Sequence, residues 1–278
     1  MKPRGMTSMD LRGGRTLRLP WPRHTGFVAG ARLQLAIFRR GWDSLLALVT
    51  VPLFTIAFLA ITRHAGRIDL TAYAVLAPAV VAVIGMAILT SGEVVTQDRS
   101  NGSLELALAA PSQFPIVVVG RVLVVTLVSL VAVVEAWLVA WIVFGVRVPV
   151  PHRTAFAGAL AVATLATVGT ALLMSSVFVA ARSARTFQNT ISYPLYLLGG
   201  AFVPVPLLPG FLHPLCRAVY LSWATDLLRD CLATKPVPDF WPRLGAVAAL
   251  GAVGFAAGYA ILIRVVDRAR ATGRVGHE

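Results

Sequence analysis

Six long apolar stretches constrain this chain more than any other feature of its sequence. They run over residues 44–62, 72–92, 120–145, 156–181, 191–208 and 244–266. A helix needs about 20 predominantly apolar residues to cross the hydrocarbon layer of a bilayer. Transmembrane strands are excluded, because these runs are too long and lack an alternation of period two. The sequence therefore predicts an all-α integral membrane protein with about six transmembrane helices.

Charge is scarce and is concentrated at the two ends of the chain. Charged residues make up 13% of the sequence, whereas soluble domains carry about 25%. Residues 1–43 hold nine Lys or Arg residues, and the tail from Arg264 holds four. Because basic residues accumulate on the cytoplasmic side of spans, we expect a plasma-membrane protein with both termini in the cytoplasm. Four arginines fall instead in predicted outer loops: Arg63, Arg67, Arg147 and Arg153.

The net charge of +13 raises the possibility of a nucleic-acid partner. Arginines beside a membrane also touch anionic lipid headgroups, and they explain the charge without any such partner. We therefore expect the bilayer, and no nucleic acid, as the partner of these residues.

The region before the first span predicts a helix on the membrane surface. Residues 1–24 form a basic tail, and residues 25–43 place five apolar side chains within one arc of a helix: Phe27, Ala31, Leu35, Phe38 and Trp42. Flanking arginines are typical of helices that lie among lipid headgroups. The alternative is that these residues extend the first span. The transmembrane domain covers residues 44–266, and residues 267–278 form a second cytoplasmic tail.

The fifth apolar stretch differs from the others in its helix breakers. Two prolines and two glycines interrupt it: Pro194, Gly199, Gly200 and Pro204. Breakers at this density indicate a kinked span, or a re-entrant segment that turns back before leaving the membrane. An outer loop over residues 209–243 would follow, and it contains Cys216 and Cys231. We expect two free thiols there, with Cys231 accessible to a membrane-impermeant maleimide.

The chain lacks the patterns that catalysis would require. A phosphate-binding loop needs Lys followed by Ser or Thr after a glycine-rich turn, but Lys2 and Lys235 are each followed by proline. The five histidines are scattered, and no spacing of His, Cys or Glu resembles a metal site. We therefore expect no catalysis by this chain, and no metal or cofactor on it.

The loop between the second and third spans, residues 93–115, carries the most informative pattern. Gly102 permits a tight turn, and Ser103 after it is a suitable N-cap. Glu105 then lies in the first turn of a helix, where the helix dipole favours a carboxylate. The pattern predicts a short cytoplasmic helix.

This short helix has one apolar face. Leu104 and Leu108 lie one turn apart on it, and Pro111 ends it. A helix of about seven residues is marginal alone in water. We therefore expect it to dock against another surface.

The loop resembles that of a known family, the permease subunits of type-2 ABC exporters of the drug, antibiotic and polysaccharide branches. The matching residues are Glu93, Arg99, Gly102, Ser103, Leu104, Glu105 and Pro111. Arg121 stands where that family has a basic residue at the start of its third span. Residues 199–212 resemble the family's fifth span and re-entrant outer segment, and residues 223–230 resemble the stretch that follows. Trp223 is a departure, because a small residue or Thr is commoner there.

The resemblance implies a machine of two permeases and two ABC ATPase subunits, with ATP and Mg²⁺ bound to the ATPase. The short helix would be a coupling helix that docks on the ATPase and transmits its closure to the spans. The coupling residues would be Glu93, Arg99, Gly102, Ser103, Leu104, Glu105, Leu108 and Pro111. The second permease would be an identical copy or a sibling chain.

The resemblance also implies a substrate path between the two permeases, lined by the second and fifth spans. The candidates there are Met86, Thr90, Asn189, Tyr193, Tyr196 and Phe202. Glu135 is a separate candidate, because an ionisable group inside a span is expensive and by default functional. It would attract a cationic substrate or bond across a helix interface. The alternative is a protonated, hydrogen-bonded side chain.

These features together predict a permease that exports a drug, antibiotic or lipid-like molecule from the cytoplasm or inner leaflet. Export of an oligosaccharide or polysaccharide is the alternative within the same family. A secondary transporter is a further alternative, although such carriers show internal repeats and this sequence has no evident repeat. A membrane-embedded enzyme of unrecognised chemistry is the last alternative.

Overall fold

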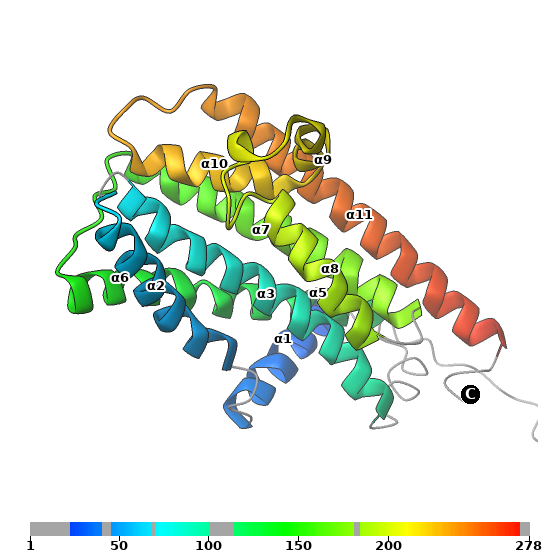
Figure 1. Ribbon diagram of the computed structural model, residues 1–278. Coiled ribbons are helices and arrows are strands. Elements are labelled where there is room, and N and C mark those ends of the chain that lie inside the picture. Colours follow the sequence, from blue (N-terminus) through cyan, green and yellow to red (C-terminus); the bar gives the residue numbers. More distant parts are fainter. Residues whose placement is uncertain (1–22, 41–45, 68–69, 101–113, 181–183, 273–278) are drawn as a thin grey trace, which may run out of the picture.

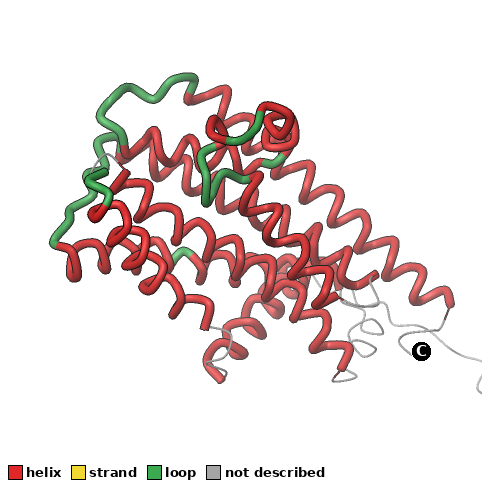
Figure 2. The backbone as a smooth tube through the Cα atoms, in the orientation of Figure 1, coloured by secondary structure: helices red, strands yellow, loops and turns green. Residues whose placement is uncertain are grey.

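The computed structural model describes residues 23–40, 46–67, 70–100, 114–180 and 184–272. These residues form helices, turns and short connections, and no strand occurs among them (Figure 2). Four of their helical segments are long and apolar enough to cross a membrane: Thr71–Ile88, Phe114–Phe144, Arg153–Phe178 and Phe240–Arg268. The prediction of an all-α membrane protein is confirmed.

The helices follow one another with short connections. Their bounds are α1 Arg23–Arg40, α2 Leu46–His64, α3 Thr71–Ser100, α5 Phe114–Ser129, α6 Val131–Phe144, α7 Arg153–Ala180, α8 Ala184–Leu198, η3 Val205–Leu207, η4 Gly210–Leu212, α9 His213–Ala218, α10 Tyr220–Leu232 and α11 Phe240–Thr272. The first and fifth predicted spans fall on α2, of 19 residues, and α8, of 15 residues, neither of which is among the four long apolar segments.

The third predicted span is divided at Leu130 into α5 and α6, and it begins at Phe114 rather than near residue 120. Two hydroxyl groups precede the division. Thr126 donates to the carbonyl oxygen of Val122 at 2.9 Å, and Ser129 donates to that of Thr126 at 2.7 Å. Such bonds compete with the helical ladder and often bend a helix. They account for a break that hydropathy alone does not reveal.

Helices α7 and α11 run side by side along their lengths (Figure 1). Small residues allow their backbones to approach closely. A Cβ atom added to Gly251 would lie 2.5 Å from the Cα atom of Ala166, and one added to Gly169 would lie 2.3 Å from the carbonyl oxygen of Gly251. One added to Gly258 would lie 2.5 Å from the backbone nitrogen of Leu173. We call this contact the α7–α11 seam.

Helix α1 packs against α5. A Cβ atom added to Gly30 would lie 2.2 Å from the carbonyl oxygen of Val117, and one added to Gly120 would lie 2.4 Å from that of Phe27. Leu35, expected on the apolar stripe that faces the lipid headgroups, is exposed rather than packed on α5. The side of α1 that faces protein is therefore set by glycine rather than by the largest apolar side chains.

Residues 209–243, predicted as an outer loop, contain η4, α9, α10 and the start of α11. The segment predicted as an outer loop therefore contains a packed helix, α10. Its buried face includes Leu221, Leu227 and Leu228, and it packs on α7, α11 and α3. An amphipathic helix of 13 residues carries too little continuous hydropathy to be recognised as a membrane element.

Cys216 in α9 and Cys231 in α10 are free thiols, and both are fully buried. Burial also raises the pKa of each thiol, which disfavours the thiolate, the reactive form of cysteine. The expectation of free thiols agrees with the structure. The expectation that a maleimide reaches Cys231 does not, because α10 presents this residue to the protein interior.

The ends of α2 and α6 are joined by Arg63. Its guanidinium donates to the carbonyl oxygen of Phe144 at 2.7 Å and lies 5.2 Å from the centre of the Phe144 ring. Phe144 is the last residue of α6, and Gly145 caps that helix in the left-handed conformation. Arg63 therefore satisfies a helix-end carbonyl at the favourable pole of the helix dipole.

Candidate functional site

The chain reverses after α8 in a turn over residues 199–202, which we call the outer turn after the side on which the sequence predicts it. Gly200 has a φ of +68°, a conformation that glycine adopts without strain. The backbone nitrogen of Ala201 donates to the carbonyl oxygen of Tyr196 at 3.1 Å, and that of Gly200 donates to Leu197 at 3.1 Å. This pair of bonds is a Schellman motif, so the glycines end α8 rather than kink a longer span.

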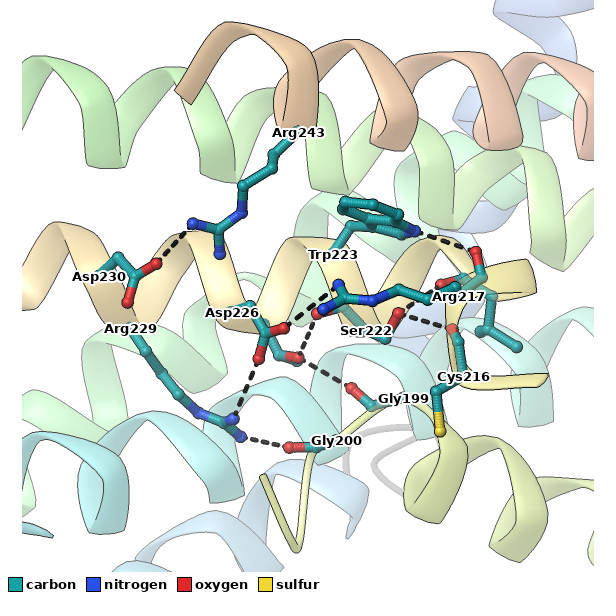
Figure 3. A network of polar contacts seen from close by, with 12 residues as sticks. Gly199, Gly200, Cys216, Arg217, Ser222, Trp223, Asp226, Arg229, Asp230 and Arg243 are labelled. Atoms are coloured by element: carbon teal, nitrogen blue, oxygen red, sulfur yellow. Dashed lines mark hydrogen bonds and ion pairs between the residues drawn. The ribbon is translucent and has the colours of Figure 1, made fainter. Parts of the chain in front are cut away.

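Side chains from two other helices bind the carbonyl oxygens of the outer turn, and Figure 3 shows the bond from Arg229 to Gly200. Thr225 of α10 donates to the carbonyl oxygen of Gly199 at 2.8 Å, and Arg229 of α10 donates to that of Gly200. Tyr73 of α3 has its hydroxyl 3.2 Å from the carbonyl oxygen of Ala201 and also in contact with that of Phe202. The carbonyl oxygens of Gly199 and Gly200 thus each have a side-chain donor, and those of Ala201 and Phe202 share the single hydroxyl proton of Tyr73. We call Tyr73, Thr225 and Arg229 the outer clamp.

Charge around the outer clamp is arranged about Asp226. Its carboxylate lies 3.6 Å from Arg229 on one side and 3.6 Å from Arg217 of α9 on the other. Helix α10 is not one of the four membrane-spanning segments. Burial raises the pKa of Asp226 above its ordinary value, although the neighbouring arginines, Arg229 foremost, act to lower it.

Further bonds fix α10 to its neighbours. Arg243 of α11 donates to Asp230 at 2.6 Å, and the indole nitrogen of Trp223 donates to the carbonyl oxygen of Arg217 at 2.9 Å. The Arg217 guanidinium also stacks over the Trp223 ring, 4.4 Å from its centre. Trp223, the residue that departs from the expected pattern, therefore joins α9 to α10.

The aromatic path candidates lie beside the outer turn. Tyr196 packs edge to face against Phe202, with ring centres 5.8 Å apart. The Tyr196 hydroxyl lies 2.7 Å from where a Cβ atom of Gly85 would be, so α3 accommodates it only because residue 85 is glycine. Tyr193, one turn earlier on α8, is 73% exposed. The structure thus brings three of the predicted path residues to one end of α8.

The other path candidates lie elsewhere. Met86 is fully buried in the cluster formed by α2, α3 and α6. Glu135 lies on α6, which packs on α2 and α3. Its Oε2 atom is buried without a hydrogen-bond partner, as is the hydroxyl of Thr55 on α2. Thr90 and Asn189 belong to the α3 and α8 helices, but the positions of their side chains are outside the described part of the structure.

A small cavity lies between α3, α7 and α10. It has a volume of about 30 Å³ and a wall that is almost entirely apolar. Thr167 and Tyr220 share a hydrogen bond of 2.8 Å at its edge. The cavity has room for little more than a water molecule.

The sequence model of the ABC-2 type transporter family matches residues 27–232. This match covers most of the chain and runs from α1 to the last residue of α10. The chain belongs to the ABC-2 type transporter family. Its members are transmembrane subunits, which agrees with the four apolar helical segments found here. No curated protein sequence matches this ABC-2 type transporter.

Most of the predicted coupling residues of this ABC-2 type transporter lie outside the described residues: Gly102, Ser103, Leu104, Glu105, Leu108 and Pro111. Glu93 and Arg99 belong to the last part of α3, where only the helix itself is described. The described ends of this loop are therefore Ser100 and Phe114. The loop was predicted to begin at residue 93, but α3 continues as a helix to Ser100.

One buried polar contact lies near the start of α5. Arg121 is 2% exposed and donates from Nε to the side-chain oxygen of Gln34 on α1 at 3.2 Å. Sequence reasoning identified Arg121 through the family resemblance but gave no role to Gln34. The contact attaches α1 to the helix that follows the predicted coupling loop.

Sequence reasoning also missed Tyr73 and the roles of Thr225 and Arg229. Their acceptors are backbone carbonyl oxygens, which carry no sequence signal. The only available signal was the lone tyrosine at the start of the second apolar stretch, where an amphipathic ring is ordinary at a membrane interface.

Proposed function

We propose that this chain is the permease subunit of an ATP-driven exporter that moves a drug, antibiotic or lipid-like molecule out of the cytoplasm or inner leaflet. Two copies of an ABC ATPase would bind ATP and Mg²⁺, and a second permease, identical or a sibling, would complete the path. The observation that carries the proposal is the match to the ABC-2 type transporter family over residues 27–232. The two lysines, each followed by proline, support an ATPase on a separate chain.

The arrangement of helix ends supports a cytoplasmic coupling loop. The last residues of α3 and α11 point toward the same end of the molecule as α1 (Figure 1). Exposed arginines lie on α1 and near the end of α11, including Arg32, Arg39, Arg264 and Arg268. Basic residues on one side favour that side as cytoplasmic. In the proposed orientation, residues 101–113 face the ATPase.

The character of the path supports an apolar or amphipathic cargo. The three described path residues at the end of α8 are aromatic: Tyr193, Tyr196 and Phe202. Aromatic rings provide apolar contact area together with a polar edge. Glu135 would contribute a carboxylate for a cationic cargo, because the structure leaves one of its oxygens buried without a partner.

Transport by reconstituted protein tests the proposal. The permease and its ATPase would be placed in proteoliposomes with three probes: ethidium, a fluorescently labelled phosphatidylethanolamine, and an undecaprenyl-linked oligosaccharide. We expect ATP-dependent movement of the first or second probe, and none without the ATPase. Movement of the oligosaccharide alone would assign the polysaccharide branch. Movement that needs an ion gradient and not ATP would contradict the proposal.

Coupling is tested by two substitutions in the loop. Glu105→Arg and Leu104→Asp should leave the permease inserted but lower export at least tenfold, because the helix loses its docking contacts with the ATPase. The measurements are export, co-purification of the ATPase and substrate-stimulated ATP hydrolysis. Lys235→Glu is the control, since it reverses the charge of an exposed residue on the connection between α10 and α11. Wild-type values for both loop variants would show that the loop is only a connector.

A further inference from the structure

The outer turn has more hydrogen-bond donors than the end of a helix alone requires. A Schellman motif already satisfies carbonyl groups within α8. The outer clamp adds donors to the four carbonyl groups of residues 199–202. These donors come from α3 and α10, two helices that contact each other, and α3 also contacts α8. The position of the turn is therefore defined by helices on both sides of it.

Two members of the outer clamp, Arg229 and Tyr73, also contact each other. The Arg229 guanidinium lies over the ring of Tyr73, 4.3 Å from its centre. Cation–π contacts of this kind strengthen when water is excluded, and the Arg229 side chain is only 17% exposed. Asp226 holds the other side of the guanidinium at 3.6 Å. A displacement of α10 relative to α3 would therefore break the contacts of both residues with the turn.

The outer turn also positions an aromatic pair, Phe202 and Tyr196. Phe202 is the last residue of the outer turn, and its own carbonyl oxygen is bound by Tyr73. Its ring packs against Tyr196, whose carbonyl oxygen accepts the backbone N–H of Ala201. The clamp acts on the backbone at one end of this pair, and the pair stands at the end of α8 beside the outer turn.

The glycines of the turn prevent a compensating rearrangement. A Cβ atom at Gly199 would lie 2.0 Å from a methyl carbon of Leu221 on α10 and 2.7 Å from the carbonyl oxygen of Leu195. The turn is thus already in closest contact with α10. A side chain at residue 199 would therefore displace Leu221 or the turn itself.

We propose that Tyr73 and Arg229 are positioning residues for transport: by clamping the outer turn they hold Phe202 against Tyr196 and thereby set the width of the outer end of the substrate path. The transport role rests on the proposed function. The clamping itself is a property of this chain alone, and it can be measured without cargo or ATPase.

The direct test is the rate at which residue 202 reacts with a reagent from the aqueous phase. Phe202→Cys would be placed in a chain with Cys216→Ala and Cys231→Ala, purified in nanodiscs, and treated with a charged maleimide. Tyr73→Phe and Arg229→Gln should each raise the labelling rate about tenfold, because each removes a hydrogen bond to a buried carbonyl group. Arg229→Lys should restore slow labelling in part, since it retains a cationic donor.

Arg243→Gln is the matched control. It removes a similarly buried arginine that also bonds to α10, through Asp230, but it does not touch the outer turn. Its labelling rate should stay within about twofold of the parent, as expected of a site without shared partners. Tyr73→Phe is conservative enough to fold if Arg229→Gln does not. Equal rates in Tyr73→Phe, Arg229→Gln and the control would overturn the clamp.

Transport supplies the second test. In the proteoliposomes described above, Arg229→Gln should change the apparent KM for the transported probe, and it should have no further effect in a Phe202→Ala background. An equal effect in both backgrounds would mean that Arg229 does not act through Phe202. Failure of the labelling test overturns the clamp and leaves the exporter assignment intact. Labelling as expected, without ATP-driven transport, overturns the exporter assignment instead.

Discussion

The α7–α11 seam and the outer turn both hold helices together, but by opposite means. At the seam, Gly251 and Ala166 bring two backbones into contact, and the interaction depends on shape. At the outer turn, Thr225 and Arg229 donate hydrogen bonds to backbone carbonyl groups, and the interaction depends on polar atoms. Helices in a membrane gain little from the hydrophobic effect when they associate, so close packing and hydrogen bonds are the main remaining sources of stability.

The difference teaches which part of the permease can move. A backbone contact between small residues has one good geometry and loses its dispersion energy when the helices separate. A hydrogen bond to a carbonyl group can be exchanged for another donor, including water. The seam is therefore suited to a rigid pair of helices, and the outer turn to a contact that opens and closes.

The largest expected effect comes from adding a side chain to the seam. Gly251→Leu would force α7 and α11 apart, because its Cβ atom would lie 2.5 Å from the Cα atom of Ala166. We expect a loss of about 3 kcal/mol or more in the free energy of unfolding, since a backbone cannot move aside as a side chain can. The measurement is unfolding of the purified permease by SDS titration in mixed micelles.

Gly245→Leu is the control for this substitution. It lies on the same helix, and a Cβ atom there meets nothing within 4 Å. Its effect should be about 0.5 kcal/mol or less. If the two variants lost the same stability, helix propensity rather than the seam would explain the loss.

A smaller loss of stability is expected when one threonine is replaced by valine at the outer clamp, and it can be compared with the same replacement at the seam. Thr225→Val removes the donor to Gly199 and leaves a buried carbonyl group unsatisfied, which costs about 1–3 kcal/mol. Thr170→Val at the seam removes only a bond to Ala166, a residue of its own helix, and should cost about 0.5 kcal/mol or less. Both are measured by the same SDS titration. A reversed order would mean that polar bonds also hold the seam.

The smallest effect is expected at Asp226. Because burial raises its pKa, the native protein binds this proton more tightly than the unfolded chain does. Stability should therefore be greatest below the ordinary pKa of 3.8 and should fall as the pH rises through the raised pKa. Asp226→Asn should therefore be more stable than the wild type near neutral pH, by about 1 kcal/mol or less, because the amide avoids the cost of burying a charge and its oxygen still accepts from the arginines.

Unfolding of the wild type and of Asp226→Asn across this pH range tests the sign. The difference between the two curves isolates the carboxyl group. If the wild type gained stability over the variant as the pH rose, the ion pairs with Arg217 and Arg229 would outweigh burial.

The same contrast explains how much could be predicted from the sequence. Long apolar runs predict α3, α7 and α11, because hydropathy is summed over many residues. The glycines of the last span, Gly254 and Gly258, indicate close packing, but the structure places the tight contacts at Gly251 and Gly258 and finds ordinary contact at Gly254. The spacing of glycines in the sequence indicates that the helix has a closely packed face. Which of these glycines touch the neighbouring helix depends on the shape of that helix.

For the outer turn, the sequence predicts only the residues that interrupt the helix. Gly199 and Gly200 indicate that the fifth helix is interrupted, and the structure ends α8 there. The clamp itself joins residues as far apart as Tyr73 and Phe202. A bond from a side chain to a distant backbone oxygen leaves no periodic pattern, so no reading of local sequence could have assigned Tyr73 to it.

Arg63 has a consequence for how orientation is inferred in related chains. Counting arginines treats each one near a span as a signal for the side on which it must remain. Arg63 falls in a loop predicted on the outer side, yet its guanidinium is bound to the carbonyl oxygen and ring of Phe144. An arginine that closes a helix end serves the folded state after insertion, whichever side it occupies. A charge count that omits such arginines would separate the two sides of this membrane protein more clearly than a count of them all.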